Sequence, residues 1–194
     1  KAQSEVADAV RAAAKMLASL GAQVEEVTLP RAEEMARTNG IITPADAATV
    51  HRQHLKERPE DIGEDVLKRM RRGESFTAQD YAQARRAQVE LRRMMEHFFQ
   101  SYDALITPTT PSAAPLREGA DAVETAAQLT AFTAPFNLTG LPAASVPCGF
   151  TSDGLPIGLQ IVCAPWQEAL TLRIAQAYEQ ATEWHTRRAV NGER

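Results

Sequence analysis

The chain has 194 residues, a formal charge of −4, and 44% hydrophobic against 24% charged residues, which is the balance of an ordinary globular protein. Because Lys and Arg are scattered among Asp and Glu, the charge pattern offers no basic surface for nucleic acid or an anionic membrane. No apolar run approaches the roughly 18 residues that would span a bilayer, and no basic-then-apolar leader begins the chain. We therefore expect a soluble protein with no nucleic-acid or membrane partner.

Two cysteines occur, Cys148 and Cys163. So few cysteines in a chain of this size without a leader are typical of the cytoplasm, where both thiols would be free and buried. The spacing alone leaves a disulfide between them open. The chain begins at Lys1, and a predicted helix follows within a few residues, as in a cut piece of a longer protein or a processed end.

The first predicted element is a helix over residues 6–20, because apolar residues recur there every three or four positions. This stripe consists of Val6, Val10, Ala13, Leu17 and Leu20. Gly21 is predicted to end the helix, and residues 24–29 then form a short strand before Pro30. A helix followed by a strand is typical of an α/β protein.

Interrupted helices are predicted next. Asn39-Gly40 and Pro44 break the pattern over residues 31–57, which predicts two short helices there. Another helix over residues 62–72 is predicted to close at Gly73. Thr77 and Asp80 have the spacing of a capping box that opens a longer helix. The predicted inner face of that helix carries Tyr81, Ala84, Leu91, Met95 and Phe98, and its arginines lie beside glutamates on a solvated outer face.

Strands dominate the second half of the prediction. Residues 104–106 predict a strand buried on both faces that enters a stiff, exposed loop over residues 107–111. A helix over residues 122–130 precedes an apolar stretch of turn formers over residues 132–142. Residues 145–150 and 157–163 flank Ser152-Asp153-Gly154 as a hairpin. A last helix from Gln167 carries a buried stripe, and the tail after Trp184 is polar; the stripe is Leu170, Ile174, Ala177, Tyr178 and Ala181.

Candidate reactive side chains are few. His51 and His54 lie three residues apart on a predicted helix, but with no third ligand nearby we interpret them as solvated side chains and expect no metal. Cys148 has no base close in sequence, so we interpret it as a small buried filler rather than a nucleophile. Ser145 sits inside a predicted strand, where its hydroxyl would bond backbone or point into packing. No motif for a cofactor is present, and we expect none.

Three ordered blocks carry a family resemblance. They are residues 102–111 (YDALITPTTP), 136–149 (FNLTGLPAASVPCG) and 154–162 (GLPIGLQIV), and they closely resemble the carboxy-terminal blocks of the amidase signature family. Residues 20–30 (LGAQVEEVTLP) are similar to a helix–strand unit of that family. The resemblance implies an α/β fold in which residues 1–194 form the C-terminal portion of an amidase signature domain, a partial mixed β-sheet flanked by helices.

The resemblance also implies a reaction, the hydrolysis of carboxylic amides to an acid and ammonia or an amine by a Ser-cisSer-Lys triad. In that scheme an uncharged Lys takes a proton from the bridging Ser, and amides of a Gly-rich loop stabilise the oxyanion. The ten glycines of this chain are never adjacent and its seven serines never pair. We therefore carry no catalytic residue over, expect the triad to lie upstream, and expect this chain alone to hydrolyse no amide.

Two segments are candidates for the wall of the substrate pocket. The loop after Ile106 and the apolar turn over residues 132–138 both break regular structure at strand ends and carry little charge. The residues that we single out in them are Thr107, Pro108, Phe132, Phe136 and Asn137. The alternative, which the sequence leaves open, is that these residues only fix turns and fill core.

Three functions stay open. The parent protein is a stand-alone amidase for a small-molecule amide, or the glutaminase subunit of a tRNA-dependent amidotransferase, or the chain is a non-catalytic structural or interaction module. The amidotransferase type usually carries an Arg- and aromatic-rich Asp-Gly stretch where this chain has residues 46–54 (DAATVHRQH), which favours the amidase. An incomplete sheet leaves an unpaired edge, so we also expect homo-oligomers through that edge.

Overall fold

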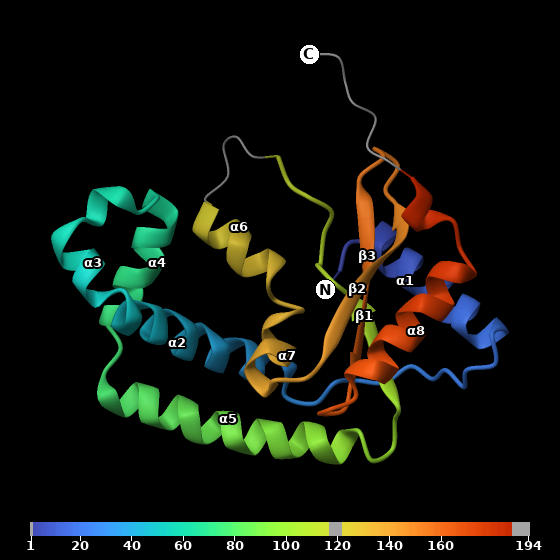
Figure 1. Ribbon diagram of the computed structural model, residues 1–194, viewed down its shortest axis with the longest axis horizontal. Coiled ribbons are helices and arrows are strands. Elements are labelled where there is room, and N and C mark those ends of the chain that lie inside the picture. The colour runs from blue at the N-terminus through green and yellow to red at the C-terminus, as the bar shows by residue number, and fades with distance from the viewer. Residues whose placement is uncertain (1, 117–121, 188–194) are drawn as a thin grey trace. The chain divides into compact units, whose positions relative to one another are not determined.

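The computed structural model describes residues 2–116 and 122–187, whose elements fall into two compact units (Figure 1). Unit 1 draws on residues 1–27, 102–114 and 142–194, and unit 2 on residues 28–101 and 115–141. Lys1 and most of the predicted polar tail lie outside the described residues. The predicted α/β class, with a partial sheet flanked by helices, is confirmed: the described sheet belongs to unit 1, and unit 2 is helical.

The sheet of unit 1 consists of β1 (Ala104–Pro108), β2 (Ala143–Phe150) and β3 (Pro156–Cys163) in the order β1-β3-β2, with both pairs antiparallel. The predicted hairpin is confirmed. β2 and β3 are joined by a turn in which Gly154 has a φ of +79°, a conformation that favours glycine because it has no Cβ. Across the turn, the Thr151 amide donates to the Leu155 carbonyl at 2.9 Å.

The central strand of this sheet is β3, in which every residue from Leu159 to Cys163 is buried. The strand predicted at residues 104–106 extends to Pro108 and lies at an edge of the described sheet, where only Leu105 is fully buried. The prediction of a strand buried on both faces was therefore wrong for β1. An apolar run of three residues does not distinguish a central strand from an edge strand that packs on one side.

One face of the sheet packs against two helices, α1 (Ser4–Ser19) and α8 (Glu168–Gln180), which lie beside it in Figure 1. The strands contribute Val146, Cys148, Ile157, Leu159 and Ile161 to this core, and the helices contribute Val6, Val10, Ala13, Leu17, Ala175 and Tyr178. Because neighbouring side chains on a strand point to opposite faces, the alternate residues of β1, β2 and β3 lie on the other side of the sheet.

The helices of unit 1 match the prediction at their positions. The helix predicted over residues 6–20 is α1, and Gly21 follows it with a φ of +100°. The stripe of α8 is rotated from the prediction, because Thr171 and Ala175 are buried while Ala177 is exposed. The strand predicted over residues 24–29 does not form: this segment makes no ladder with another part of the described chain, and a strand needs a backbone partner.

Unit 2 contains the described α-helices other than α1 and α8, and the 3₁₀ turn η2 (Trp184–Thr186) belongs to unit 1. Two of them, α2 and α5, run side by side in Figure 1 and pack against each other. The predicted capping box of α5 is confirmed, since the Asp80 amide donates to Thr77 Oγ1 at 3.1 Å and the Thr77 amide donates to Asp80 Oδ2 at 2.9 Å. The elements are α2 (Ala32–Val50), α3 (Arg52–Glu57), the 3₁₀ turn η1 (Pro59–Asp61), α4 (Glu64–Glu74), α5 (Ala78–Phe98), α6 (Ala122–Leu129) and α7 (Ala134–Thr139).

Three helix breaks that the sequence predicted, at Gly40, Pro44 and Gly73, do not occur. Helix α2 continues through Gly40 and Pro44, and the break before α3 comes at His51. Gly73 lies inside α4 instead of ending it: a Cβ at this position would stand 2.0 Å from the Pro44 carbonyl oxygen. The backbones of α2 and α4 therefore touch where only glycine fits, and this contact accounts for a glycine and a proline that sequence reasoning treated as helix breakers.

The apolar stretch predicted as a turn over residues 132–138 is largely the short helix α7. Pro135 lies in its first turn, and Gly140 follows it with a φ of +69°. A proline near the start and a glycine just past the end are ordinary helix boundaries, so residues that were interpreted as turn formers instead delimit a helix.

Candidate functional site

Thr107 and Pro108, two of the predicted pocket residues, end strand β1 and are both half-buried. Thr107 lies opposite Gln160 on β3. Its Oγ1 accepts a hydrogen bond from Gln160 Nε2 at 2.9 Å and donates to the Pro108 carbonyl at 3.1 Å. The end of β1 is therefore held in place by side-chain as well as ladder hydrogen bonds.

The other three predicted pocket residues lie in unit 2, close together on one segment. Phe136 is buried within α7 at 3% exposure and belongs to the core of its unit. Phe132 is half-buried just before the helix, while Asn137 is exposed on it. Helix α7 is fixed to α5, because Gln88 Nε2 donates to the Leu138 carbonyl at 2.7 Å. Asn137 is thus the member of this set whose polar group is open to solvent.

A depression lies immediately beyond Pro108, and we call it the hydroxyl pocket. Its volume is about 340 Å³, and it is lined by Thr109, Thr110, Ser145, Val146, Pro147, Pro156, Ile157 and Gly158. Two hydroxyls from opposite sides of β3 meet here: Thr109 Oγ1 and Ser145 Oγ are 2.6 Å apart, and either can be the donor. Ser145 therefore pairs with a threonine side chain, and the prediction that its hydroxyl bonds backbone or points into packing was wrong.

Gly158 on the central strand makes this pairing sterically feasible. A Cβ on Gly158 would lie 2.7 Å from Thr109 Oγ1 and 2.9 Å from Ser145 Oγ, both closer than van der Waals contact allows. The Gly158 carbonyl also accepts the Thr109 amide at 2.9 Å. The two hydroxyls thus meet over a residue that has no side chain.

The loop that carries Thr109 is tied down on both sides of the pocket. Thr110 Oγ1 donates to the Ser112 carbonyl at 2.7 Å, and the Gln3 amide donates to the Pro111 carbonyl at 2.8 Å. Pro108 and Pro111 restrict φ as well. The residues of this loop are half-buried, so the prediction that the loop is exposed was wrong, and its stiffness stays a prediction.

Sequence reasoning missed Thr109, Ser145 and Gly158 as members of one site. Thr109 and Ser145 are 36 positions apart, and only the register of β1 and β2 on β3 brings them together. The available signal was the alternation of Thr107 and Thr109, which places both side chains on the same face of a strand.

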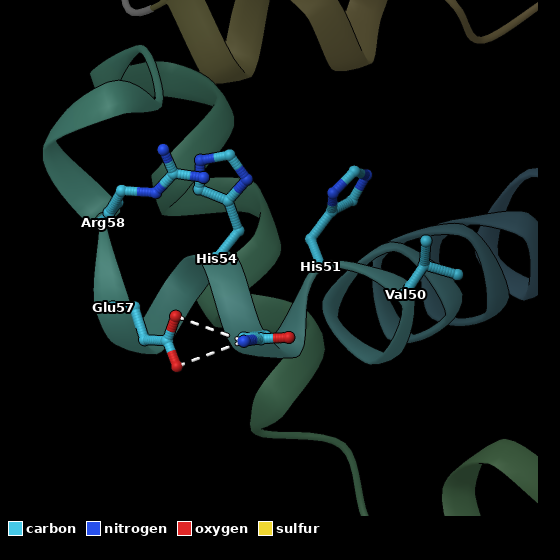
Figure 2. Close-up of a pocket in the computed structure, with 6 residues that line it drawn as sticks. Val50, His51, His54, Glu57 and Arg58 are labelled. Atoms are coloured by element: carbon cyan, nitrogen blue, oxygen red, sulfur yellow. Dashed lines mark hydrogen bonds between the residues drawn. The ribbon is translucent and has the colours of Figure 1, made fainter.

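A second depression, of about 320 Å³, lies in unit 2 and is shown in Figure 2; we call it the histidine pocket. It is lined by Val50, His51, Gln53, His54, Glu57 and Arg58. Gln53 donates to both carboxylate oxygens of Glu57 at 3.3 Å, the bonds drawn as dashed lines.

His51 is exposed, as predicted, whereas His54 is half-buried with its Nε2 3.8 Å from Asp61 Oδ2. Within residues 2–116 and 122–187, no three His, Cys, Asp or Glu side chains are grouped so as to hold a metal ion. A His–Asp contact of this length at the surface of a helix contributes little to stability, and the lining of the histidine pocket contains no Ser, Thr or Cys side chain.

The two cysteines are free and buried, as predicted for Cys148 and Cys163. Burial raises the pKa of the Cys148 thiol from 9.0 to about 11. Because the thiolate is the reactive form, this cysteine stays protonated near neutral pH and serves as core filler.

Comparison with known proteins confirms the resemblance of the three blocks. The profile of the family described as Amidase matches residues 1–172. The chain belongs to the amidase family. It is 38% identical, over 94% of its length, to a protein named Amidase from Pseudomonas putida, of which it covers 41%. It is also 35% identical, over 96% of its length, to a Glutamyl-tRNA(Gln) amidotransferase subunit from Moorella thermoacetica, of which it covers 43%.

A solved amidase-family relative shares the fold. The structure of 6-aminohexanoate cyclic dimer hydrolase complexed with substrate matches with a TM-score of 0.80 and 30% identity, over 96% of this chain and 43% of that one. The chain thus spans about two fifths of the length of the relatives it matches. Among the described residues, no helix is long and apolar enough to cross a membrane.

Proposed function

We propose that these residues form the C-terminal scaffold and part of the substrate-pocket wall of an amidase. The parent enzyme hydrolyses carboxylic amides to an acid and ammonia or an amine, with a Ser-cisSer-Lys triad supplied by residues outside this chain. The observation that carries the proposal is the family match over residues 1–172. The hydroxyl pocket supports it, because its lining comes from the three sequence blocks that resemble the amidase signature family.

The chemistry of the described side chains agrees with a binding role. Amide hydrolysis by a covalent route needs a nucleophile beside a base. Ser145 has a hydroxyl as its partner, and Thr109 cannot act as a base near neutral pH. The pocket therefore offers hydrogen bonds and shape, while the nucleophile, the base and the oxyanion donors come from elsewhere in the parent enzyme.

The second candidate is the glutaminase subunit of a tRNA-dependent amidotransferase, which the relative from Moorella thermoacetica favours. Against it stands the stretch over residues 46–54, which lacks the Arg- and aromatic-rich pattern of that type. Asp46, the first residue of this stretch, accepts a hydrogen bond from the Tyr81 hydroxyl at 2.7 Å. This bond joins α2 to α5 and has a structural role. A non-catalytic module is the third candidate.

Ammonia release tests the proposal. The polypeptide encoded by the whole reading frame and the 194-residue chain are each assayed with pentanamide, benzamide and glutamine, and hydroxylamine is added to trap an acyl-enzyme. We expect the longer polypeptide to release ammonia and form hydroxamates from the simple amides, and the shorter chain to do neither. Turnover by the shorter chain would overturn the placement of the triad, and turnover of glutamine alone would favour the amidotransferase.

A further inference from the structure

The lining of the hydroxyl pocket carries no ionisable side chain. Its polar groups are hydroxyls and backbone, and the remainder is Val146, Ile157 and prolines. A carboxylate placed against this lining would gain no counter-charge from it, whereas a neutral polar group can be satisfied by the hydroxyls and the backbone. The pocket therefore favours an uncharged ligand.

The Thr109–Ser145 pair also has unused hydrogen-bonding capacity. Two hydroxyls carry two hydrogens, and their mutual bond at 2.6 Å uses one of them. Neither side chain makes another hydrogen bond within the part of the chain that the structure describes. The pair can thus donate one hydrogen and accept others, which matches a group such as a carboxamide, whose carbonyl accepts and whose N–H donates.

The position of the pair is fixed before any ligand arrives. Thr109 is held by the hydrogen bond that its backbone N–H donates to the Gly158 carbonyl, and Ser145 lies opposite Gln160 in the ladder of β2 and β3. Because donors and acceptors that are already in place lose little freedom on binding, a preorganised pair of this kind contributes to affinity and to selection.

We propose that the Thr109–Ser145 pair is a specificity-determining site that binds an uncharged, hydrogen-bonding part of the substrate and discriminates against a carboxylate at the same place. The inference rests on the proposed function, since it names the substrate class of that pocket. It excludes substrates that would place an acidic group over Gly158.

Calorimetric titration of the whole reading-frame polypeptide tests this with two ligands of the same length. Propylurea is neutral, and pentanoate has a carboxylate in place of the terminal carboxamide. We expect propylurea to bind and the carboxylate to bind at least about tenfold more weakly, because no lining side chain neutralises it. Absence of propylurea binding, or equal or tighter binding of the carboxylate, overturns the inference.

Four variants test whether the Thr109–Ser145 pair determines the affinity for propylurea. Thr109→Val and Ser145→Ala each remove one hydroxyl and are expected to weaken propylurea binding about threefold to tenfold, which is the range for one neutral hydrogen bond. Gly158→Ala should weaken it as well, because the new Cβ displaces both hydroxyls. Thr109→Ser keeps the hydroxyl and should restore wild-type affinity.

The matched control is Ser152→Ala, which removes a hydroxyl from the nearby hairpin turn outside the pocket and should leave affinity unchanged. If Thr109→Val lowers the melting temperature, its affinity no longer reports on the hydroxyl alone. The affinities of Ser145→Ala and Thr109→Ser for propylurea then test the inference. Unchanged affinity in Ser145→Ala, or no rescue in Thr109→Ser, contradicts the inference. Loss of ammonia release with intact, Ser145-dependent binding would contradict only the proposed function.

Discussion

The two faces of the β1-β3-β2 sheet differ in what they present. One face is apolar and closed by α1 and α8, with Leu159 and Ile161 at 0% exposure. The opposite face carries Thr107 and Gln160 and, beyond them, Thr109 and Ser145. We therefore expect substitutions on the apolar face to change mainly stability, and substitutions in the Thr109–Ser145 pair to change mainly binding. The central strand β3 therefore contributes both to the core and to the proposed binding site.

The largest expected effect is on the apolar face. Leu159→Ala removes a fully buried side chain and should lower the free energy of unfolding by about 2–5 kcal/mol, measured by urea denaturation. Leu172→Ala, on the exposed side of α8 at 65% exposure, is the control and should change it by less than about 0.5 kcal/mol. Equal losses in the two variants would show that this face is not the core.

The free energy of unfolding should also depend on pH, through two groups buried at the apolar face. Burial raises the pKa of Cys148 to about 11 and that of Tyr178 to about 12. In each case the unfolded chain loses its proton first, so the stabilisation is complete below pH 9 and is lost as pH rises through 9 to 12. Urea unfolding at pH 8, 10 and 11 should show this decline, and Cys148→Ala should flatten its lower part. Stability that rises over this range would contradict the burial of both groups.

On the polar face, Thr107→Val removes the acceptor of the Gln160 amide and should cost about 1 kcal/mol. Thr107→Ser keeps the hydroxyl and should cost less. The melting temperature of both variants measures the difference, and identical values would mean that this hydrogen bond does not stabilise the end of β1.

Ser145→Ala should have a still smaller effect on stability, below about 0.5 kcal/mol, because Ser145 is exposed and exposed substitutions are usually close to neutral. Its effect should appear in ligand affinity instead. A loss of more than about 2 kcal/mol in urea denaturation would place Ser145 in the scaffold and remove the distinction between the faces.

Self-association through the edges of the sheet should be the weakest of these effects. Within the described residues, β1 and β2 each pair on one side only, and an unpaired edge favours association with another copy. Static light scattering of the 194-residue chain should therefore give an apparent mass that rises with concentration. A constant monomer mass over the whole range would count against association through an edge.

The elements that the sequence predicted correctly are those that neighbouring residues determine. The apolar stripe of α1, the Thr77 capping box and the hairpin around Gly154 each depend on residues a few positions apart. The continuity of α2 through Pro44 could not be predicted, because it accompanies a backbone contact with Gly73 on another helix.

Prediction of the site was limited in the same way, because its residues are far apart in the sequence. Thr107 and Pro108 were predicted from the end of a strand, and neither of them lines the hydroxyl pocket. The pairing of Thr109 with Ser145 depends on cross-strand register. Periodicity within a strand does not specify which strand lies next to it. The assignments of Thr107, Pro108, Phe132, Phe136 and Asn137 to the pocket wall all stay predictions.

The most direct test of the account is the KM of the whole reading-frame polypeptide for pentanamide before and after Thr109→Val. The account predicts that the unmodified polypeptide releases ammonia. It also predicts that the variant raises KM at least about threefold, with kcat and melting temperature nearly unchanged. An unchanged KM, or a fall in kcat alone, would contradict the claim that the polar face of this sheet binds the substrate of an amidase.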